Sequence, residues 1–191
     1  LPKYKGMGPL VRSIMNGDYY TGISIHQINK SVDAGKIILQ KKIKIPYNCS
    51  GASLLNKFKK EYPKLILKSL KIVKSGKIIL YKQTLNNEKV NKSIKEIDRK
   101  INWDDDTLVI YNKIRAFSYP FDGTIIFLNK KKLLVDKAKI LNINYPNNYP
   151  NGTVLKILTN SLHVKTSHGL LSIKLYNDND YKIIKKYNRF K

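Results

Sequence analysis

Two side chains that can act as general acids or bases, His26 and Asp33, lie seven residues apart in the sequence. Taken alone, an Asp before Ala-Gly is typical of a turn, and a histidine on a strand is usually packed or half-exposed. Gly6 and Gly8 permit a tight turn and a close approach of the backbone. The spacing of these residues therefore leaves their chemistry open.

Metal and disulfide chemistry find no support in the sequence. His163 and His168 have no Cys or acidic neighbour at ligand spacing, so we expect no metal site. Cys49 is the only cysteine, which excludes an internal disulfide and favours the cytoplasm. Apolar runs are only a few residues long, whereas a membrane helix needs roughly 20, so we expect no membrane partner. Residues 1–10 lack a signal-peptide pattern. Because Leu1 is not Met, we expect a longer reading frame or a cleavage.

A strand, a loop and a second strand are the elements expected to position His26 and Asp33. Apolar and polar residues alternate over 22–28, which predicts the first strand. Residues 29–35 form the loop, and residues 36–45 the second strand, which Pro46 ends. The unit should be a hairpin on a sheet edge. The expected buried residues of its second strand are Ile37, Leu39, Ile43 and Ile45.

Two helices flank this hairpin. Residues 9–16 should form a short one that ends at Gly17. Residues 50–75 should form a long one closed by Gly76, and Pro63 should kink it or split it at Tyr62. Apolar residues that recur at three- and four-residue spacing carry this prediction: Ala52, Leu55, Phe58, Tyr62, Leu65, Ile66, Leu70 and Val73.

The sequence pattern changes after residue 100. We expect domains at 1–83 and 101–191, joined by a linker at 84–100. Asp104-Asp105-Asp106-Thr107 offers N-cap chemistry for a helix that ends near Phe117. Short runs with turn residues between them predict a small antiparallel barrel or sandwich. These runs span 124–128, 132–139, 152–158, 161–166 and 170–175. Periodicity alone therefore predicts an α/β piece followed by a β-barrel.

The net charge is +24, and 33 of the 37 basic residues are lysine. Such an excess is the footprint of nucleic-acid binding, but readers of nucleic acids usually rely on arginine. Lys, Asn and Ile are also the residues that an AT-rich genome supplies in excess. Genomic bias, anionic small substrates and RNA all remain explanations of the charge.

Two strings resemble the folate-dependent formyltransferase family. One runs from Leu1-Pro2-Lys3-Tyr4-Lys5-Gly6 through Asn16-Gly17-Asp18 and Thr21-Gly22-Ile23 to Asp33-Ala34-Gly35. The other begins at Ile101-Asn102-Trp103 and continues over residues 110–123. The resemblance implies an α/β fold, in which the C-terminal part of a Rossmann-like catalytic domain precedes a small antiparallel, OB-like β-barrel. Formyl-tetrahydrofolate is the implied formyl donor.

Site residues follow from the same resemblance, which implies that Asp33 is catalytic, orienting a histidine and helping to take the proton lost by the attacking amine. Lys5 stands where the family has Arg, and its alternative is a solvated lysine. The other implied substrate or cofactor contacts are Gly6, Gly8, Pro9, Thr21, His26, Val32 and Gly35. The family's remaining catalytic Asn and His belong to an Asn-x-His-x-Ser string that this sequence lacks. We therefore expect the isolated chain to be inactive.

Three markers favour a nucleotide-linked amino sugar as the formyl acceptor. Three residues separate Arg115-Ala116 from Pro120, His26 stands where the tRNA branch commonly has Met, and the loop reads Asp33-Ala34-Gly35. The first alternative is a methionyl-tRNA formyltransferase with tRNA as partner. The second is an inactive fragment or a binding module. A homodimer is a further expectation.

Overall fold

The computed structural model describes residues 1–84 and 89–191. The chain divides into two compact units. Unit 1 comprises Leu1–Ser13 and Asp18–Ile94, and unit 2 comprises Ile14–Gly17 and Lys95–Lys191. Residues 85–88 of the expected linker lie outside the described part, and the domain boundaries expected above stay a prediction.

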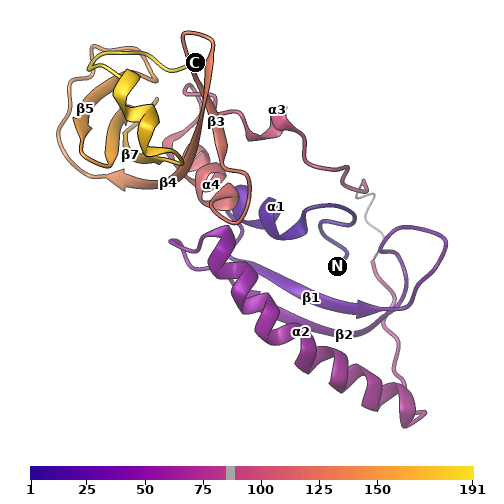
Figure 1. Ribbon diagram of the computed structural model, residues 1–191. Helices are drawn as coiled ribbons and strands as arrows, with labels where there is room; N and C mark the ends of the chain where they lie inside the picture. Colours follow the sequence, from indigo (N-terminus) through magenta and orange to yellow (C-terminus); the bar gives the residue numbers. More distant parts are fainter. Residues whose placement is uncertain (85–88) are drawn as a thin grey trace. The chain divides into compact units, whose positions relative to one another are not determined.

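A two-stranded antiparallel sheet lies at the centre of unit 1 (Figure 1). It follows α1 (Pro9–Met15), which ends at Gly17 with a φ of 71°. The strands are β1 (Tyr20–His26) and β2 (Ile37–Lys44), and their register shifts between Ile25 and His26. The predicted hairpin is confirmed. Of its expected buried residues, Ile37, Ile43 and Ile45 are buried and Leu39 is half-buried.

Helix α2 (Gly51–Lys74) packs against both strands of this sheet. Ser50 caps its N-terminus by accepting a hydrogen bond from the Ser53 N–H at 3.2 Å. The expected split at Tyr62 is wrong, because the helix continues through Pro63. Pro63 and Lys59 are exposed, so water can satisfy the Lys59 carbonyl group that proline leaves without an intrahelical partner.

The apolar face of α2 is only partly buried. Leu54, Phe58 and Leu65 are buried, so Leu54 takes the place expected for Leu55. Four other expected apolar positions, from the middle of the helix to its C-terminal end, are instead exposed. They are Tyr62, Ile66, Leu70 and Val73, with exposed fractions of 43–49%.

The segment after α2 runs beside two earlier parts of unit 1. Tyr81 pairs with Ile37 at the edge of β2 through two backbone hydrogen bonds of 2.8 and 2.9 Å. Further on, Asn91 pairs with Gly6 in a parallel bridge. These pairings fix the backbone on both sides of residue 83 and bring it close to the loop between β1 and β2.

Unit 2 contains a curved five-stranded antiparallel sheet and the helix α4 (Thr107–Phe117) (Figure 1). A short helix, α3 (Glu96–Arg99), precedes them. The Asp106 side chain caps α4 by accepting from the Leu108 N–H at 2.8 Å, as the run of aspartates predicts. The sheet has the order β3-β4-β7-β6-β5. Its strands are β3 (Thr124–Leu128), β4 (Lys131–Leu141), β5 (Val154–Leu158), β6 (Ser161–Lys165) and β7 (Leu170–Leu175). A 3₁₀ helix, η1 (Asp178–Ile183), follows the last strand.

The core of unit 2 lies between α4 and the inner face of the sheet. Trp103 and Tyr111 both belong to this core. The alternation expected for half-buried strands is clear in β4 and β7. No pairing between β3 and β5 closes the sheet within the described residues. The predicted barrel is therefore unconfirmed, and the structure shows a five-stranded antiparallel sheet in its place.

No helix in residues 1–84 or 89–191 is both long enough and apolar enough to cross a membrane.

Candidate functional site

Asp33 lies in the loop between β1 and β2 in a left-handed backbone conformation, with a φ of 51°. Asp is one of the few residues with a side chain that adopt this region readily. Gly35 follows where the loop passes close to the end of β1, since a Cβ there would lie 1.7 Å from the Gln27 carbonyl oxygen. The loop therefore has one geometry that only a few residue types allow.

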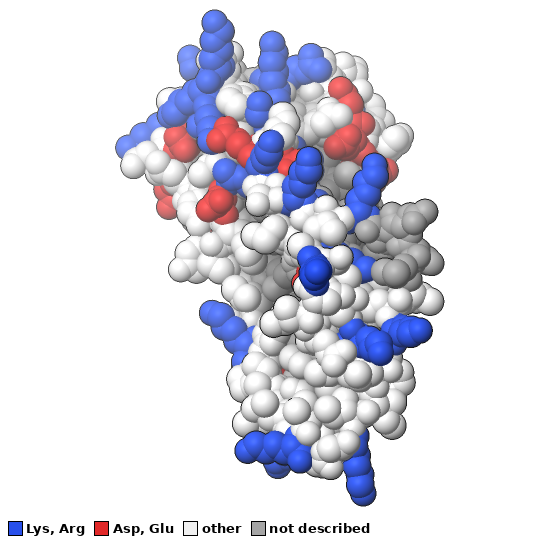
Figure 2. Space-filling view, turned by 90° about the vertical axis from the view of Figure 1, so that its right-hand side faces the viewer, with Lys and Arg blue, Asp and Glu red and all other residues white. Residues whose placement is uncertain are grey.

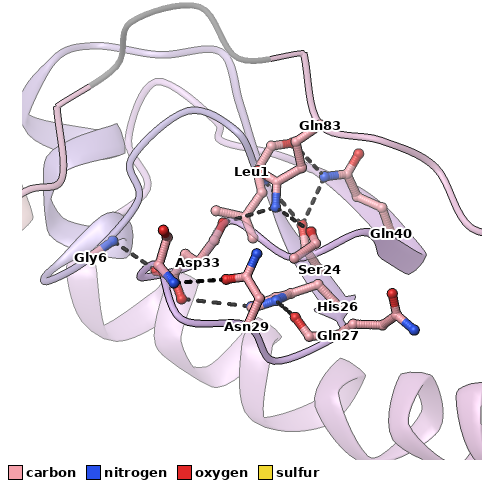
Figure 3. Close-up of polar contacts among 11 residues, drawn as sticks. Leu1, Gly6, Ser24, His26, Gln27, Asn29, Asp33, Gln40 and Gln83 are labelled. Carbon is pink, nitrogen blue, oxygen red and sulfur yellow. Dashed lines mark hydrogen bonds and ion pairs between the residues drawn. The ribbon is translucent and has the colours of Figure 1, made fainter.

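The Asp33 carboxylate is oriented by a distant part of the chain (Figure 3). Its Oδ2 accepts a hydrogen bond of 2.7 Å from the Gly6 N–H. Gly6 has a φ of 89°, and a Cβ there would lie 2.5 Å from the Asn91 carbonyl oxygen. Glycine is thus required at position 6, where its N–H fixes one oxygen of the carboxylate.

The second carboxylate oxygen faces His26, with Nε2 of the ring 3.6 Å from Oδ1 of Asp33 (Figure 3). The other ring nitrogen, Nδ1, lies 2.8 Å from the Gln27 carbonyl oxygen. A carbonyl oxygen only accepts hydrogen bonds, so this contact places a proton on Nδ1. Nε2 then carries a proton only in the charged ring, which makes His26 and Asp33 a pair that can exchange one proton.

A cavity of about 560 Å³ contains the exposed sides of His26 and Asp33. Its volume lies in the usual range for small-molecule sites, roughly 300–1,000 Å³. Their side chains are 21% and 34% exposed, so a ligand in the cavity can reach both. The remaining lining combines aromatic, basic and hydroxyl side chains from unit 1, including Tyr4, Tyr20, Thr21, Ser24, Lys41 and Lys42.

A second polar cluster lines the same cavity. Asp18 accepts hydrogen bonds from Lys3 Nζ at 2.8 and 3.0 Å and from the Tyr4 hydroxyl at 2.7 Å. The hydrogen bond to Asp18 raises the pKa of Lys3 above its ordinary value. This cluster fixes the Tyr4 ring at the cavity wall and keeps Lys3 charged at neutral pH.

The structure brings four of the predicted site residues to the cavity: Pro9, Thr21, His26 and Asp33. Gly6 and Gly35 shape the Asp33 loop, while Val32 is exposed and Gly8 packs against Ile94. Lys5 is only 5% exposed, so the alternative of a solvated lysine is wrong. Its carbonyl oxygen accepts hydrogen bonds from Asn91.

Three polar residues at or near the site were missed by the sequence analysis as site residues. Gln40 lines the cavity and donates to Ser24 Oγ at 2.8 Å. Asp18 belongs to the Asn-Gly-Asp turn that was noted only as part of a string. Gln83, the last residue of the first expected domain, reaches the Asp33 loop from the segment after α2. No local pattern marks Gln83, because its partners are 48 and 50 residues away.

Metal binding finds no support in the geometry. Within residues 1–84 and 89–191, no three His, Cys, Asp or Glu side chains come together as a metal ion would require. Cys49 is buried, as cysteine side chains usually are.

Two family models match the chain. The model described as "Formyl transferase, C-terminal domain" matches residues 93–190, and the model described as "Formyl transferase" matches residues 1–70.

Among curated proteins, the chain is similar to methionyl-tRNA formyltransferases. It is 30% identical to that of Caldicellulosiruptor saccharolyticus over 174 residues, which cover 91% of this chain and 55% of the relative. It is 31% identical to that of Mesoplasma florum, with coverages of 92% and 55%. The chain thus spans about half the length of the curated relatives it matches.

Among solved structures, the chain is similar to sugar formyltransferases. The crystal structure of WlaRD, a sugar 3N-formyl transferase in the presence of dTDP and 5-N-formyl-THF, matches with a TM-score of 0.72 and 25% identity. That match covers 93% of this chain and 62% of WlaRD. The N-formyltransferase of Helicobacter canadensis, in complex with folinic acid and dTDP-3-aminofucose, shares the fold with a TM-score of 0.72 and 22% identity. It covers 92% of this chain and 63% of that protein.

Proposed function

Because the chain belongs to the formyl transferase family, we propose that its protein transfers a formyl group from formyl-tetrahydrofolate to the amine of a nucleotide-linked amino sugar. The observation that carries the proposal is the Asp33 carboxylate. It is fixed by the Gly6 N–H, lies 3.6 Å from His26, and opens into a cavity of about 560 Å³.

This cavity is the proposed site of the folate donor, because its volume is that of an ordinary small-molecule site and the titratable side chains of His26 and Asp33 line it. When bound, the folate supplies an activated formyl group, whose bond to a folate nitrogen is exchanged for a bond to the acceptor amine. The chemistry left to this chain is to position the amine and to remove its proton.

Asp33 is the proposed acceptor of that proton. Its Oδ2 is held by a main-chain donor, which leaves Oδ1 for the amine or for His26. Since Nδ1 of His26 already donates to Gln27, Nε2 is the ring nitrogen that can take up the proton and later return it. The returned proton ends on the folate nitrogen, so the overall transfer consumes none.

The cavity wall supports an anionic acceptor of small size. Three lysines line it: Lys42, and also Lys3 and Lys41, which form ion pairs with Asp18 and Glu61. Lys42 Nζ lies 4.0 Å from the centre of the Tyr20 ring, which keeps an aromatic face and a positive charge side by side. A nucleotide diphosphate offers a base to stack and phosphates to pair with such groups. The three markers noted in the sequence favour the same acceptor.

The remaining predicted site residues take supporting roles in this proposal. Gly6 and Gly35 shape the loop that carries Asp33. Pro9 and Thr21 form part of the cavity wall. Val32, which is exposed, is a proposed contact for a part of the substrates that extends beyond the cavity, whereas Lys5 is buried and Gly8 packs against Ile94.

Methionyl-tRNA is the second candidate acceptor, favoured by the names of the curated relatives. The charge distribution supports it less well. Residues 95–191 hold 18 basic and 9 acidic residues, a net of +9, whereas residues 1–94 hold 19 and 4, a net of +15. The excess charge is thus not concentrated in the C-terminal domain, where the tRNA reading would place the acceptor stem. Figure 2 shows basic side chains mixed with acidic ones in the upper part of the face in view and separated by uncharged surface in the lower part.

The test offers the longest polypeptide that the gene encodes formyl-tetrahydrofolate with either a dTDP-linked amino sugar or charged initiator tRNA. We expect formyl transfer to the sugar, and Asp33→Asn should lower kcat by about 10²- to 10⁴-fold, as for the loss of a general base. Asn tolerates the left-handed backbone of position 33, so the substitution tests the carboxylate alone.

Asp122→Asn is the matched control, because this carboxylate is 84% exposed and lies outside the cavity. It should leave kcat unchanged. Transfer to tRNA alone would replace the sugar with the second candidate. Transfer to neither acceptor would favour the reading as an inactive fragment or a binding module.

A further inference from the structure

Gln83 connects the segment after α2 to the Asp33 loop (Figure 3). Its Nε2 donates hydrogen bonds to the carbonyl oxygens of Asp33 at 2.8 Å and Gly35 at 2.7 Å. The side chain amide has only two hydrogens, so both are used on the backbone of this one loop. Gln83 therefore fixes the loop on either side of Ala34.

The backbone that carries Gln83 is itself held in place. Tyr81, two residues earlier, pairs with Ile37 through two backbone hydrogen bonds. Ile37 begins β2, directly after the Asp33 loop. Gln83 therefore lies on a segment that pairs with β2, the strand that directly follows the Asp33 loop. A short path through β2 thus joins this segment to the loop that Gln83 holds.

The other end of the Gln83 side chain is less well satisfied. Gln83 is 8% exposed, and its Oε1 is buried with no hydrogen-bond partner within the described residues. A buried acceptor without a partner is unfavourable. Gln83 therefore contributes little through Oε1, and its structural role rests on the two bonds made by Nε2.

The loop requires such support. Asp33 has a φ of 51°, and Gly35 lies against the Gln27 carbonyl oxygen. Conformations of this kind persist only where surrounding contacts enforce them. The Gly6 N–H fixes the carboxylate but not the loop backbone, whereas Gln83 fixes the backbone carbonyl of the same residue.

We propose that Gln83 is a positioning residue, which holds the Asp33–Gly35 turn so that the Asp33 carboxylate points at the Gly6 N–H and at His26. The residue acts through Asp33 and touches no reacting atom. The inference rests on the proposed function in taking Asp33 as the proton acceptor, but the geometry that it predicts can be measured without any turnover.

The first test is NMR spectroscopy of the 191-residue chain. The Gly6 amide proton should shift as the Asp33 carboxylate titrates, and this response should vanish in Asp33→Asn. In Gln83→Met, which keeps the length but removes the donor, the response should fall to less than half. A full response in a folded Gln83→Met chain would overturn the proposal, whatever the activity of the protein.

Two further variants guard against a folding defect. Gln83→Asn keeps the amide on a shorter side chain that cannot span both carbonyls, so it should also weaken the Gly6 response. Lys82→Ala changes an exposed neighbour and should leave the response intact. Loss of the Gly6 response in Lys82→Ala, or its full retention in Gln83→Asn, would contradict the assigned role.

The second test uses kinetics of the active polypeptide. A misplaced general base lowers kcat with little effect on KM. We expect Gln83→Met to lower kcat by about 10- to 100-fold and to leave both KM values within about twofold. A rise in KM at unchanged kcat would show that Gln83 serves binding and would refute the positioning role. If the polypeptide transfers no formyl group at all, only the proposed function fails, because the NMR result stands independently.

Discussion

At the residue scale, two uncharged hydrogen-bond donors hold Asp33 in its conformation. A main-chain N–H holds its carboxylate, and a side-chain amide holds its carbonyl group. Neither contact changes charge as the carboxylate gains or loses a proton. The carboxylate can therefore keep one geometry in both of its protonation states, as the proposed role of Asp33 requires.

Gly35 gives the most direct test of this loop. An alanine Cβ would lie 1.7 Å from the Gln27 carbonyl oxygen, so the loop or the end of β1 must move. We expect Gly35→Ala to lower the free energy of unfolding by about 2–4 kcal/mol. Urea denaturation of the chain measures this loss.

Gly76 supplies the matched control. It has a φ of 68°, but nothing lies within 4 Å of the position that a Cβ would occupy. Gly76→Ala should therefore cost only the left-handed conformation, about 1–2 kcal/mol. Equal losses in the two variants would mean that the loop at Gly35 moves without cost.

His163 on β6 predicts a pH dependence of stability. Burial lowers the pKa of His163 from its ordinary value of 6.5, and the charge of Lys156 adds to the effect. The unfolded chain therefore binds a proton at higher pH than the folded one. The resulting stability is present above pH 6.5 and is lost as the pH falls through the folded-state pKa.

Urea denaturation between pH 5 and pH 8 measures this effect. His163→Gln should make the decline in unfolding free energy below pH 6.5 shallower. His168→Gln removes an imidazole whose side chain is 79% exposed and serves as the control for losing a histidine. Identical pH profiles for wild type and His163→Gln would disprove the assignment.

At the scale of elements, α2 contains an avoidable defect. Pro63 lies inside the helix, where it removes one hydrogen bond and crowds the preceding turn. We expect Pro63→Ala to raise the free energy of unfolding by about 1–3 kcal/mol. Urea denaturation followed by circular dichroism measures the gain.

Lys60→Ala, an exposed position one turn earlier, is the control for added helix propensity. It should change stability by a few tenths of a kcal/mol at most. If Pro63→Ala gives no larger gain than Lys60→Ala, the helix already accommodates proline without cost.

Most elements could be predicted from the periodicity of apolar residues and from the residues that cap or end helices. Ser50 and Gly76 mark the ends of α2, and Asp106 caps α4. The sequence left a kink or a split at Pro63 open, and the helix continues because burial of Phe58 and Leu65 on either side outweighs the local penalty. The partial exposure of the α2 face also depends on which elements cover it, a property of the fold that no local pattern encodes.

The residues of the candidate site were likewise predicted only where local sequence marks them. His26 and Asp33 were found because they lie on one hairpin and within one recognisable string. Gln83 was missed because its role depends on contacts with residues 48 and 50 positions away. Burial of Lys5 was missed as well, since a lysine between Tyr4 and Gly6 gives no local sign of it.

At the scale of the whole molecule, the salt dependence of binding distinguishes the two candidate acceptors, because they carry different numbers of phosphates. RNA binding through several phosphates releases counterions and depends steeply on salt, whereas a nucleotide sugar brings only its diphosphate. From 50 to 200 mM salt, we expect the dissociation constant of a dTDP-linked amino sugar to rise less than about tenfold. Isothermal titration calorimetry measures it.

A tRNA ligand gives the contrasting measurement. Weak binding with a steep salt dependence is what lysines scattered over the surface should produce, without specificity for initiator tRNA. Tight binding of initiator tRNA over elongator tRNA at 200 mM salt would instead favour the second candidate acceptor.

The exposed apolar side chains of α2 also affect how the molecule behaves in concentrated solution. Two molecules can associate through these exposed apolar side chains. They are Tyr62, Ile66, Leu67, Leu70 and Val73. The net charge of +24 opposes such contact at low ionic strength. Screening shortens the range of this repulsion to about 10 Å at 0.1 M salt, and sulfate also strengthens apolar association. Colloidal stability should therefore decline with added sulfate, so a dilute, low-salt buffer is the natural choice for keeping the protein dispersed.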